Sequence, residues 1–311
     1  MRLKVSQLYH EIDARLTACH ERAVPLPGVQ NPTRRDTYIR QLIDSIRRVQ
    51  FVSAVANRDI HADRANGSSS LFDPIRAAIL KRRAGHFDDA CWLVFLFVHF
   101  GRHPRSGYRY TRDVYGALGQ RGPWTFEQVS SHPDELRAWL DANEAHLKRG
   151  SNRGFGNHRK YLSMSGSKPN GTGDAFVTYA QWVNAHGGHQ NLFDLALHFS
   201  DGSPEAAFEW LYRSMRSVAS FGRIGRFDYL TMIQKLHFAN IRPGRPYFDG
   251  STKGPNSGAR KLLESGATLS IAELERRTTL VGSALSVGMQ EMEDSLCNWG
   301  KDPNSYTYFK G

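Results

Sequence analysis

Apolar residues recur at three- and four-residue intervals along most of the chain, the spacing that places them on one face of a helix. No run of alternating apolar and polar residues predicts a strand, and no segment repeats at a fixed period. Helices are predicted at 5–16, 38–55, 72–83, 88–100, 133–148, 174–186, 189–198, 204–219, 226–238, 259–263, 270–281 and 283–299. The pattern therefore predicts an all-α fold.

The most apolar stretch of the chain, ACWLVFLFVHF at 90–100, predicts a buried helix. It is much shorter than the ~20 apolar residues that a membrane-spanning helix needs. The amphipathic N-terminal sequence also lacks the apolar centre of a signal peptide. We therefore expect a soluble, cytoplasmic protein that does not interact with a membrane.

Glycine, serine, asparagine and cationic residues are concentrated at 151–173. Such a composition is typical of a loop or connection rather than of a helix. We expect this loop to join two helical lobes, 1–150 and 174–311, within one catalytic region that covers 1–311.

The charge of the chain suggests a partner. The 311 residues include 41 Lys and Arg against 30 Asp and Glu, which gives a formal net charge of +11. A positive field attracts nucleic acid, although the same charge can serve solubility alone. The three cysteines exclude a four-cysteine iron–sulfur cluster and fit a reducing compartment.

A glycine-rich segment at 242–263 is the strongest local signal for anion binding. Its glycines permit tight turns, and it leads into a predicted helix whose first amide groups favour a phosphate. A helix, a glycine-rich hairpin and a second helix can grip one DNA strand; the alternative is a structural loop that binds nothing. The candidate DNA contacts are Lys253, Gly254, Gly258 and Arg260.

A second cationic group precedes this segment and ends in a carboxylate. It consists of Arg213, Arg216, Arg223 and Arg226, and Asp228 follows. Arginines at these spacings can hold phosphates, which orient DNA without reading its sequence. The alternative interpretation is a solvated helix face.

The short run FGNHRKY at 155–161 combines hydrogen-bond donors, a titratable ring and an aromatic face that can stack a base. Its candidate residues are Asn157, His158, Arg159, Lys160 and Tyr161. His158 has no partner at a recognised zinc spacing and the HEXXH motif is absent, so no metal site is predicted.

The last predicted helix carries an apolar stripe at helical spacing, with two acidic residues beside it. Glu293 projects close to the stripe, whereas Asp294 points away from it. A carboxylate near buried surface tends to have a raised pKa and can take part in acid–base chemistry. The alternative is a structural pair with Arg or Lys.

Several long segments of the chain are similar to one known family. They are FDPIRAAILKRRAGHFDDACWLVFLFVHFG at 72–101, FGNHRKY at 155–161, LYRSMRSVASFGRIGRFDYLTMIQKL at 211–236, PYFDGSTKGPNSGARKLL at 246–263 and MQEMEDSLCNWGKDP at 289–303. These segments resemble the third clade of the alpha-glutamyl/putrescinyl thymine pyrophosphorylase family, in order from about residue 36 to the C-terminus.

The resemblance implies a helix–hairpin–helix DNA-glycosylase-like fold, with two helical lobes around a cleft, and a link to hypermodified bases in phage DNA. Some members resemble amino acid–DNA or polyamine–DNA transferases that replace a pyrophosphate on hydroxymethylated uracil. Others resemble phage-defence glycosylases that excise a bulky modified base. Here Gly254-Pro255 replaces the Gly-x-Gly core of the usual hairpin.

We therefore expect a stand-alone DNA glycosylase, a hydrolase that flips out a hydroxymethylated or glucosylated pyrimidine and leaves an abasic site. It would need no cofactor, no metal and no obligate protein partner, and its partner would be double-stranded DNA with modified bases. The catalytic carboxylate would be Asp228, Glu293 or Asp294, and Asn157, His158 and Tyr161 would shape the base pocket. Arg159, Lys160, Arg223 and Arg226 would join the glycine-rich segment in binding DNA. The alternatives are the transferase and a DNA-binding module without catalysis.

Overall fold

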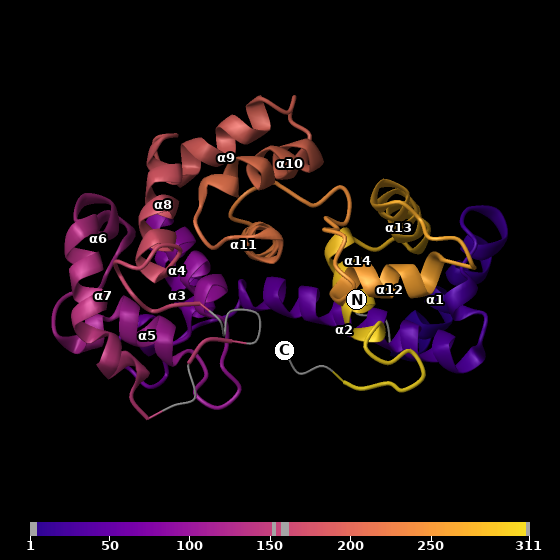
Figure 1. Ribbon diagram of the computed structural model, residues 1–311, viewed down its shortest axis with the longest axis horizontal. Coiled ribbons are helices and arrows are strands. Elements are labelled where there is room, and N and C mark those ends of the chain that lie inside the picture. Colours follow the sequence, from indigo (N-terminus) through magenta and orange to yellow (C-terminus); the bar gives the residue numbers. More distant parts are fainter. Residues whose placement is uncertain (1–4, 151–153, 157–161, 309–311) are drawn as a thin grey trace. The chain divides into compact units, whose positions relative to one another are not determined.

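The computed structural model confirms the all-α fold (Figure 1). It describes residues 5–150, 154–156 and 162–308, and within these ranges the chain forms α-helices and short 3-10 turns but no strand. The α-helices are α1 (Val5–Arg22), α2 (Pro32–Val55), α3 (Pro74–Arg83), α4 (Phe87–Phe100), α5 (Arg109–Tyr115), α6 (Phe126–Ser131), α7 (Pro133–Lys148), α8 (Thr172–Asn184), α9 (His189–His198), α10 (Pro204–Ser214), α11 (Arg223–Lys235), α12 (Gly254–Leu263), α13 (Ile271–Leu285) and α14 (Met289–Trp299). None of these helices is long and apolar enough to cross a membrane.

The chain divides into two compact units. Unit 1 contains residues 1–53 and 243–311, and unit 2 contains residues 54–242. The loop at 151–173, where the sequence predicts the boundary between lobes, falls inside unit 2, where α7 and α8 pack against each other on either side of it. The first and last parts of the sequence instead share unit 1.

Unit 1 has a mainly aliphatic core. In it, α12 packs against α14, and α1 packs against α13. Gly258 allows α12 and α14 to approach closely, because a Cβ atom there would lie 2.1 Å from the carbonyl oxygen of Leu296. The buried core residues include Leu16, Leu42, Leu262, Met292, Leu296 and Trp299.

Unit 2 is built around α4, the apolar segment that the sequence predicts to be buried. This helix packs against α3, α5, α6, α9 and α11, and Asp88 and Asp89 occupy its first turn, where carboxylates favour the helix dipole. The surrounding core is aromatic. Trp92 and Phe95 stack on each other, and Phe95 also stacks on Tyr179 with ring centroids 3.8 Å apart.

A chain of polar side chains crosses this aromatic core. Asp88 accepts a hydrogen bond from His189 Nδ1 at 2.6 Å, and His189 Nε2 lies 2.6 Å from the hydroxyl of Tyr179. That hydroxyl lies 2.8 Å from the hydroxyl of Tyr229. With its proton on Nδ1, the neutral His189 ring accepts from Tyr179, so both ring nitrogens are satisfied. Burial lowers the pKa of His189, while the His189 hydrogen bonds lower the pKa of Asp88.

Two short helices, α5 and α6, lie between the predicted helices at 88–100 and 133–148, where no helix is predicted from the sequence. Thr125 caps α6 by accepting from the amide of Gln128, a local signal that the periodicity did not reveal. The predicted helix at 204–219 is shorter, because α10 ends at Ser214 and a 3-10 turn follows.

Candidate functional site

The turn before α12 projects a lysine at an open helix end in unit 1. Asp249 Oδ1 accepts from the amide of Ser251 at 3.0 Å, and Ser251 Oγ accepts from the amide of Lys253 at 3.2 Å. Gly250 and Gly254 adopt the left-handed conformation, with φ of +78° and +65°, which a side chain would strain. The turn is therefore held by local hydrogen bonds and two glycines.

No side chain caps the N-terminus of α12, so its first amide groups point out of the helix. Lys253 stands at the cap position and is exposed. Its ammonium group makes no hydrogen bond or ion pair with the described part of the chain. Amide groups, the helix dipole and a lysine together form a favourable place for a phosphate.

The other two residues predicted to contact DNA here have structural partners. Gly258 is buried where α12 crosses α14, and it contributes by allowing that close packing. Arg260 pairs with Glu264 and donates to the carbonyl oxygen of Leu269 at 3.1 Å. Their proposed contact with DNA stays a prediction.

The connection before α12 contains the first part of the glycine-rich segment at 242–263. Residues 236–253 separate α11 from α12, and the two helices belong to different units. This connection is irregular, and it contains two prolines, Pro243 and Pro246, which cannot continue a helix.

The two acidic residues of α14 differ in environment. Glu293 is only 7% exposed, as expected for a residue beside the apolar stripe. Asp294 accepts from Arg48 Nη2 at 2.5 Å and from Ser45 Oγ at 2.8 Å, which gives it a structural ion pair on α2.

In unit 2, cationic residues surround the N-terminus of α11. Gly222 precedes the helix and no side chain caps it. Arg226 stacks over Tyr212, 4.2 Å from the ring centroid, and donates to the carbonyl oxygen of the same residue. Burial lowers the pKa of Arg226, and the nearby charge of Arg216 lowers it further. Arg216 is exposed and has no hydrogen bond or ion pair with the described residues.

Helix α11 also carries Arg223, predicted to bind DNA, and Asp228, one of the predicted catalytic carboxylates. Arg223 is the first residue of α11 and Asp228 lies further along it, and both are partly exposed. Both belong to unit 2, whereas the α12 turn belongs to unit 1.

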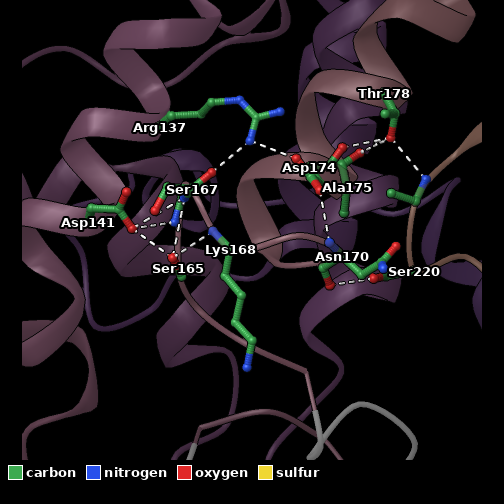
Figure 2. A network of polar contacts seen from close by, with 12 residues as sticks. Arg137, Asp141, Ser165, Ser167, Lys168, Asn170, Asp174, Ala175, Thr178 and Ser220 are labelled. Carbon is green, nitrogen blue, oxygen red and sulfur yellow. Dashed lines mark hydrogen bonds and ion pairs between the residues drawn. The ribbon is translucent and has the colours of Figure 1, made fainter.

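A polar network holds the loop at 163–171 next to Ser220, which lies just before the N-terminus of α11 (Figure 2). Asp141 accepts from the amide of Gly166 at 2.7 Å and from Ser165 Oγ at 2.8 Å. These hydrogen bonds lower the pKa of Asp141. At the other end of the loop, Ser220 Oγ donates to the carbonyl oxygen of Asn170 at 2.6 Å. Thus part of the predicted connection is an ordered loop fixed at both ends.

The network leaves one cation exposed at its edge. The Lys168 side chain runs away from the hydrogen-bonded groups in Figure 2, although its amide donates to Ser165 Oγ. The sequence does not single out Lys168, whose surroundings have the composition of an ordered loop or a flexible connection. Asp249 was not among the predicted site residues either, although it directly precedes Gly250 in the glycine-rich segment.

The five candidate residues of the run at 157–161 lie outside the described residues. Before the run, Phe155 is buried and packs edge-on against Tyr110 with ring centroids 5.1 Å apart. In the described ranges, no cluster of His, Cys, Asp or Glu side chains has the form of a metal site.

No curated protein and no solved structure matches the chain. The sequence model of the family described as alpha-glutamyl/putrescinyl thymine pyrophosphorylase clade 3 matches residues 33–311, nearly the whole chain. That description names an enzyme acting on modified thymine. The match confirms the resemblance noted in the sequence, and the chain belongs to the alpha-glutamyl/putrescinyl thymine pyrophosphorylase family, clade 3.

Proposed function

We propose that this protein is a DNA glycosylase that excises a hypermodified pyrimidine, as in defence against phage. The observation that carries the proposal is the exposed turn before α12, where Asp249 and Lys253 each directly precede a glycine at an uncapped helix N-terminus. A phosphate held at Lys253 would place the neighbouring sugar near a carboxylate. The family's connection with modified thymine supports the choice of substrate class.

The chemistry needs a flipped nucleotide and a carboxylate. Extruding a base from the duplex costs a few kcal/mol, and a bulky modified base can be recognised in a pocket once it is out. Cleavage of the N-glycosidic bond develops positive charge on the sugar. A nearby carboxylate stabilises this charge and orients the attacking water. The products would be a free base and an abasic site.

The environments of the acidic residues rank them for this role. Asp294 is engaged with Arg48 and Glu293 is buried, whereas Asp228 is partly exposed on α11. Asp249 is exposed and lies on the same turn as the phosphate-binding lysine. We therefore add Asp249 to the three carboxylates predicted from the sequence and place it first.

The test is an excision assay with matched isosteric variants. Purified protein is incubated with glucosylated or hydroxymethylated phage DNA and with unmodified DNA, and abasic sites and released bases are measured. Abasic sites are expected only in modified DNA, with a loss of about 100-fold or more in Asp249→Asn. Asp228→Asn and Glu293→Gln test the competing carboxylates. If Asp249→Asn excises the base as well as wild type does, the catalytic carboxylate is one of these competing residues. If wild type excises no base, the protein is not a glycosylase for these substrates.

The second candidate is an amino acid–DNA or polyamine–DNA transferase, which the pyrophosphorylase description of the family favours. The exposed Arg216 at the α11 end would then help to hold the departing pyrophosphate. Incorporation of a labelled amine into DNA that carries pyrophosphorylated hydroxymethyluracil would support transfer. Binding of modified DNA with neither product would support a non-catalytic module.

A further inference from the structure

Unit 1 contains a cavity of about 570 Å³ that plays no part in the proposed excision. It lies among α1, α2 and the segment after α14. Its volume is in the usual range for small-molecule sites. Two tyrosines, two carboxylates and two arginines line it: Tyr9, Tyr306, Asp36, Asp44, Arg40 and Arg47.

One of the two carboxylates, that of Asp36, already has hydrogen-bond and ion-pair partners within the protein. Asp36 accepts from the Tyr9 hydroxyl at 2.9 Å and from Arg40 Nε at 2.8 Å. Arg40 is in turn neutralised by this pair. These groups form a satisfied wall of the cavity.

The other carboxylate lacks a cation. Asp44 is 7% exposed, and its hydrogen bond with the described residues is a single one, from the Tyr306 hydroxyl at 2.7 Å. It forms no ion pair with any residue in the described ranges. A buried carboxylate is costly unless a cation pairs with it, so a cationic group that entered the cavity would be stabilised there.

An unmatched cation lines the same cavity. Arg47 follows Asp44 by three residues on α2, is exposed, and makes no hydrogen bond or ion pair with the described part of unit 1. The Asp44 carboxylate and the Arg47 guanidinium therefore both lack an ion-pair partner among the described residues, and their charges have opposite sign. A ligand with one positive and one negative end would satisfy both, whereas a simple amine or a simple acid would satisfy one.

The C-terminal segment fixes the aromatic wall beside Asp44. Gln41 Nε2 donates to the carbonyl oxygen of Thr307 at 2.9 Å, and Arg34 Nε donates to Asn304 Oδ1 at 3.0 Å. These contacts hold Tyr306 over the cavity. Because Arg40 already lies over the Tyr306 ring, 5.7 Å from its centroid, the part of Tyr306 open to an ammonium group is the hydroxyl oxygen beside Asp44.

We propose that this cavity binds a small zwitterion, with its primary ammonium at Asp44 and Tyr306 and its anionic group at Arg47. The site is independent of base excision, because its residues are separate from those assigned to that reaction.

The probes are ω-amino acids of increasing length, namely glycine, β-alanine, 4-aminobutyrate and 6-aminohexanoate, with butylamine and butyrate as single-charge references. Binding is measured by calorimetry and by chemical-shift changes in ¹⁵N-labelled full-length protein. One length is expected to bind at least about tenfold more tightly than either reference, with shifts confined to α2 and the segment around Tyr306.

Two isosteric or near-isosteric variants assign the ends of the ligand. Asp44→Asn is expected to weaken the preferred zwitterion about tenfold or more, and Arg47→Gln to reduce its affinity to that of butylamine. Glu21→Gln and Arg22→Gln, exposed substitutions on α1 outside the cavity, should change nothing. The proposal is overturned if no zwitterion binds, if butylamine or butyrate binds as well, or if the shifts lie elsewhere. These wild-type results decide it even if Asp44→Asn fails to fold.

Discussion

The two units reach a well-packed interior in different ways. Unit 1 has an aliphatic core in which glycines let backbones touch, as at Gly258 and Leu296. Unit 2 has an aromatic core crossed by the hydrogen-bonded chain from Asp88 to Tyr229. Close glycine packing also occurs in unit 2, as at Gly173 and Gly166, so what distinguishes unit 2 is the need to keep a buried polar chain satisfied and in one protonation state.

The largest effect on stability is expected from Gly258→Ala in unit 1. The new Cβ would lie 2.1 Å from the carbonyl oxygen of Leu296, and a helix backbone cannot move away easily. Overpacking of this kind costs about 3 kcal/mol of unfolding free energy. Urea unfolding followed by circular dichroism measures it, with the neighbouring Ser257→Ala as a control that should be near neutral. Equal stability of both variants would contradict the tight contact.

The next effect should come from the polar chain of unit 2. Tyr179→Phe leaves a buried His189 nitrogen without its hydrogen-bond partner, which costs about 2 kcal/mol. Tyr229→Phe removes only the end of the chain and should cost about half as much, because Tyr179 keeps its bond to His189. The two midpoints in urea test this order. The reverse order would mean that the chain is not anchored at His189.

A pH dependence should distinguish unit 2 from unit 1. Burial lowers the folded-state pKa of His189 below the ordinary value of 6.5, so the unfolded state binds more protons between the two pKa values. Stability is therefore complete above about pH 6.5 and falls on acidification, by up to about 1.4 kcal/mol per pH unit. Below about pH 3.8, protonation of Asp88 removes a further contribution to folding stability, because its pKa is lowered in the folded state.

The His189→Gln variant isolates this contribution. Its unfolding free energy, measured in urea from pH 7.5 to 4.5, should lack the His189 part of the slope seen in wild type. Identical slopes for the two proteins would show that His189 does not control the acid response.

The sequence was most informative where local periodicity governs the structure. The run at 90–100 became the central helix of unit 2, since nearly every side chain is apolar and must be buried. The division into units could not be predicted, because it depends on contacts between distant parts of the sequence, such as α1 packing against α13. The partner of Asp294 is equally non-local, since Arg48 lies 246 residues earlier. Lys253 was found because glycines and a cation before a helix have a local meaning, and Asp249 was missed because a turn aspartate is common.

A smaller change is expected for the ion pair on the surface of unit 1. Asp294→Asn removes a partly exposed pair with Arg48, which is worth about 1 kcal/mol. If Asp294 is structural, the unfolding free energy should fall by this amount while excision of modified bases continues. Loss of excision with unchanged stability would instead return Asp294 to the catalytic candidates.

The smallest change in stability is expected at the α12 turn, where unit 1 is open rather than tightly packed. Lys253 is exposed and has no partner among the described residues, so Lys253→Ala should alter the unfolding free energy by less than about 0.5 kcal/mol. Its effect should appear in DNA binding instead. Affinity should weaken on all sequences, and the slope of log K against log salt should fall by about one, as for the loss of one phosphate contact. Arg22→Ala, an exposed cation on α1, is the control for net charge. An unchanged slope in Lys253→Ala would contradict a phosphate contact at the turn. An equal change in Arg22→Ala would show that Lys253 contributes only general charge, because Arg22 has no proposed contact with phosphate.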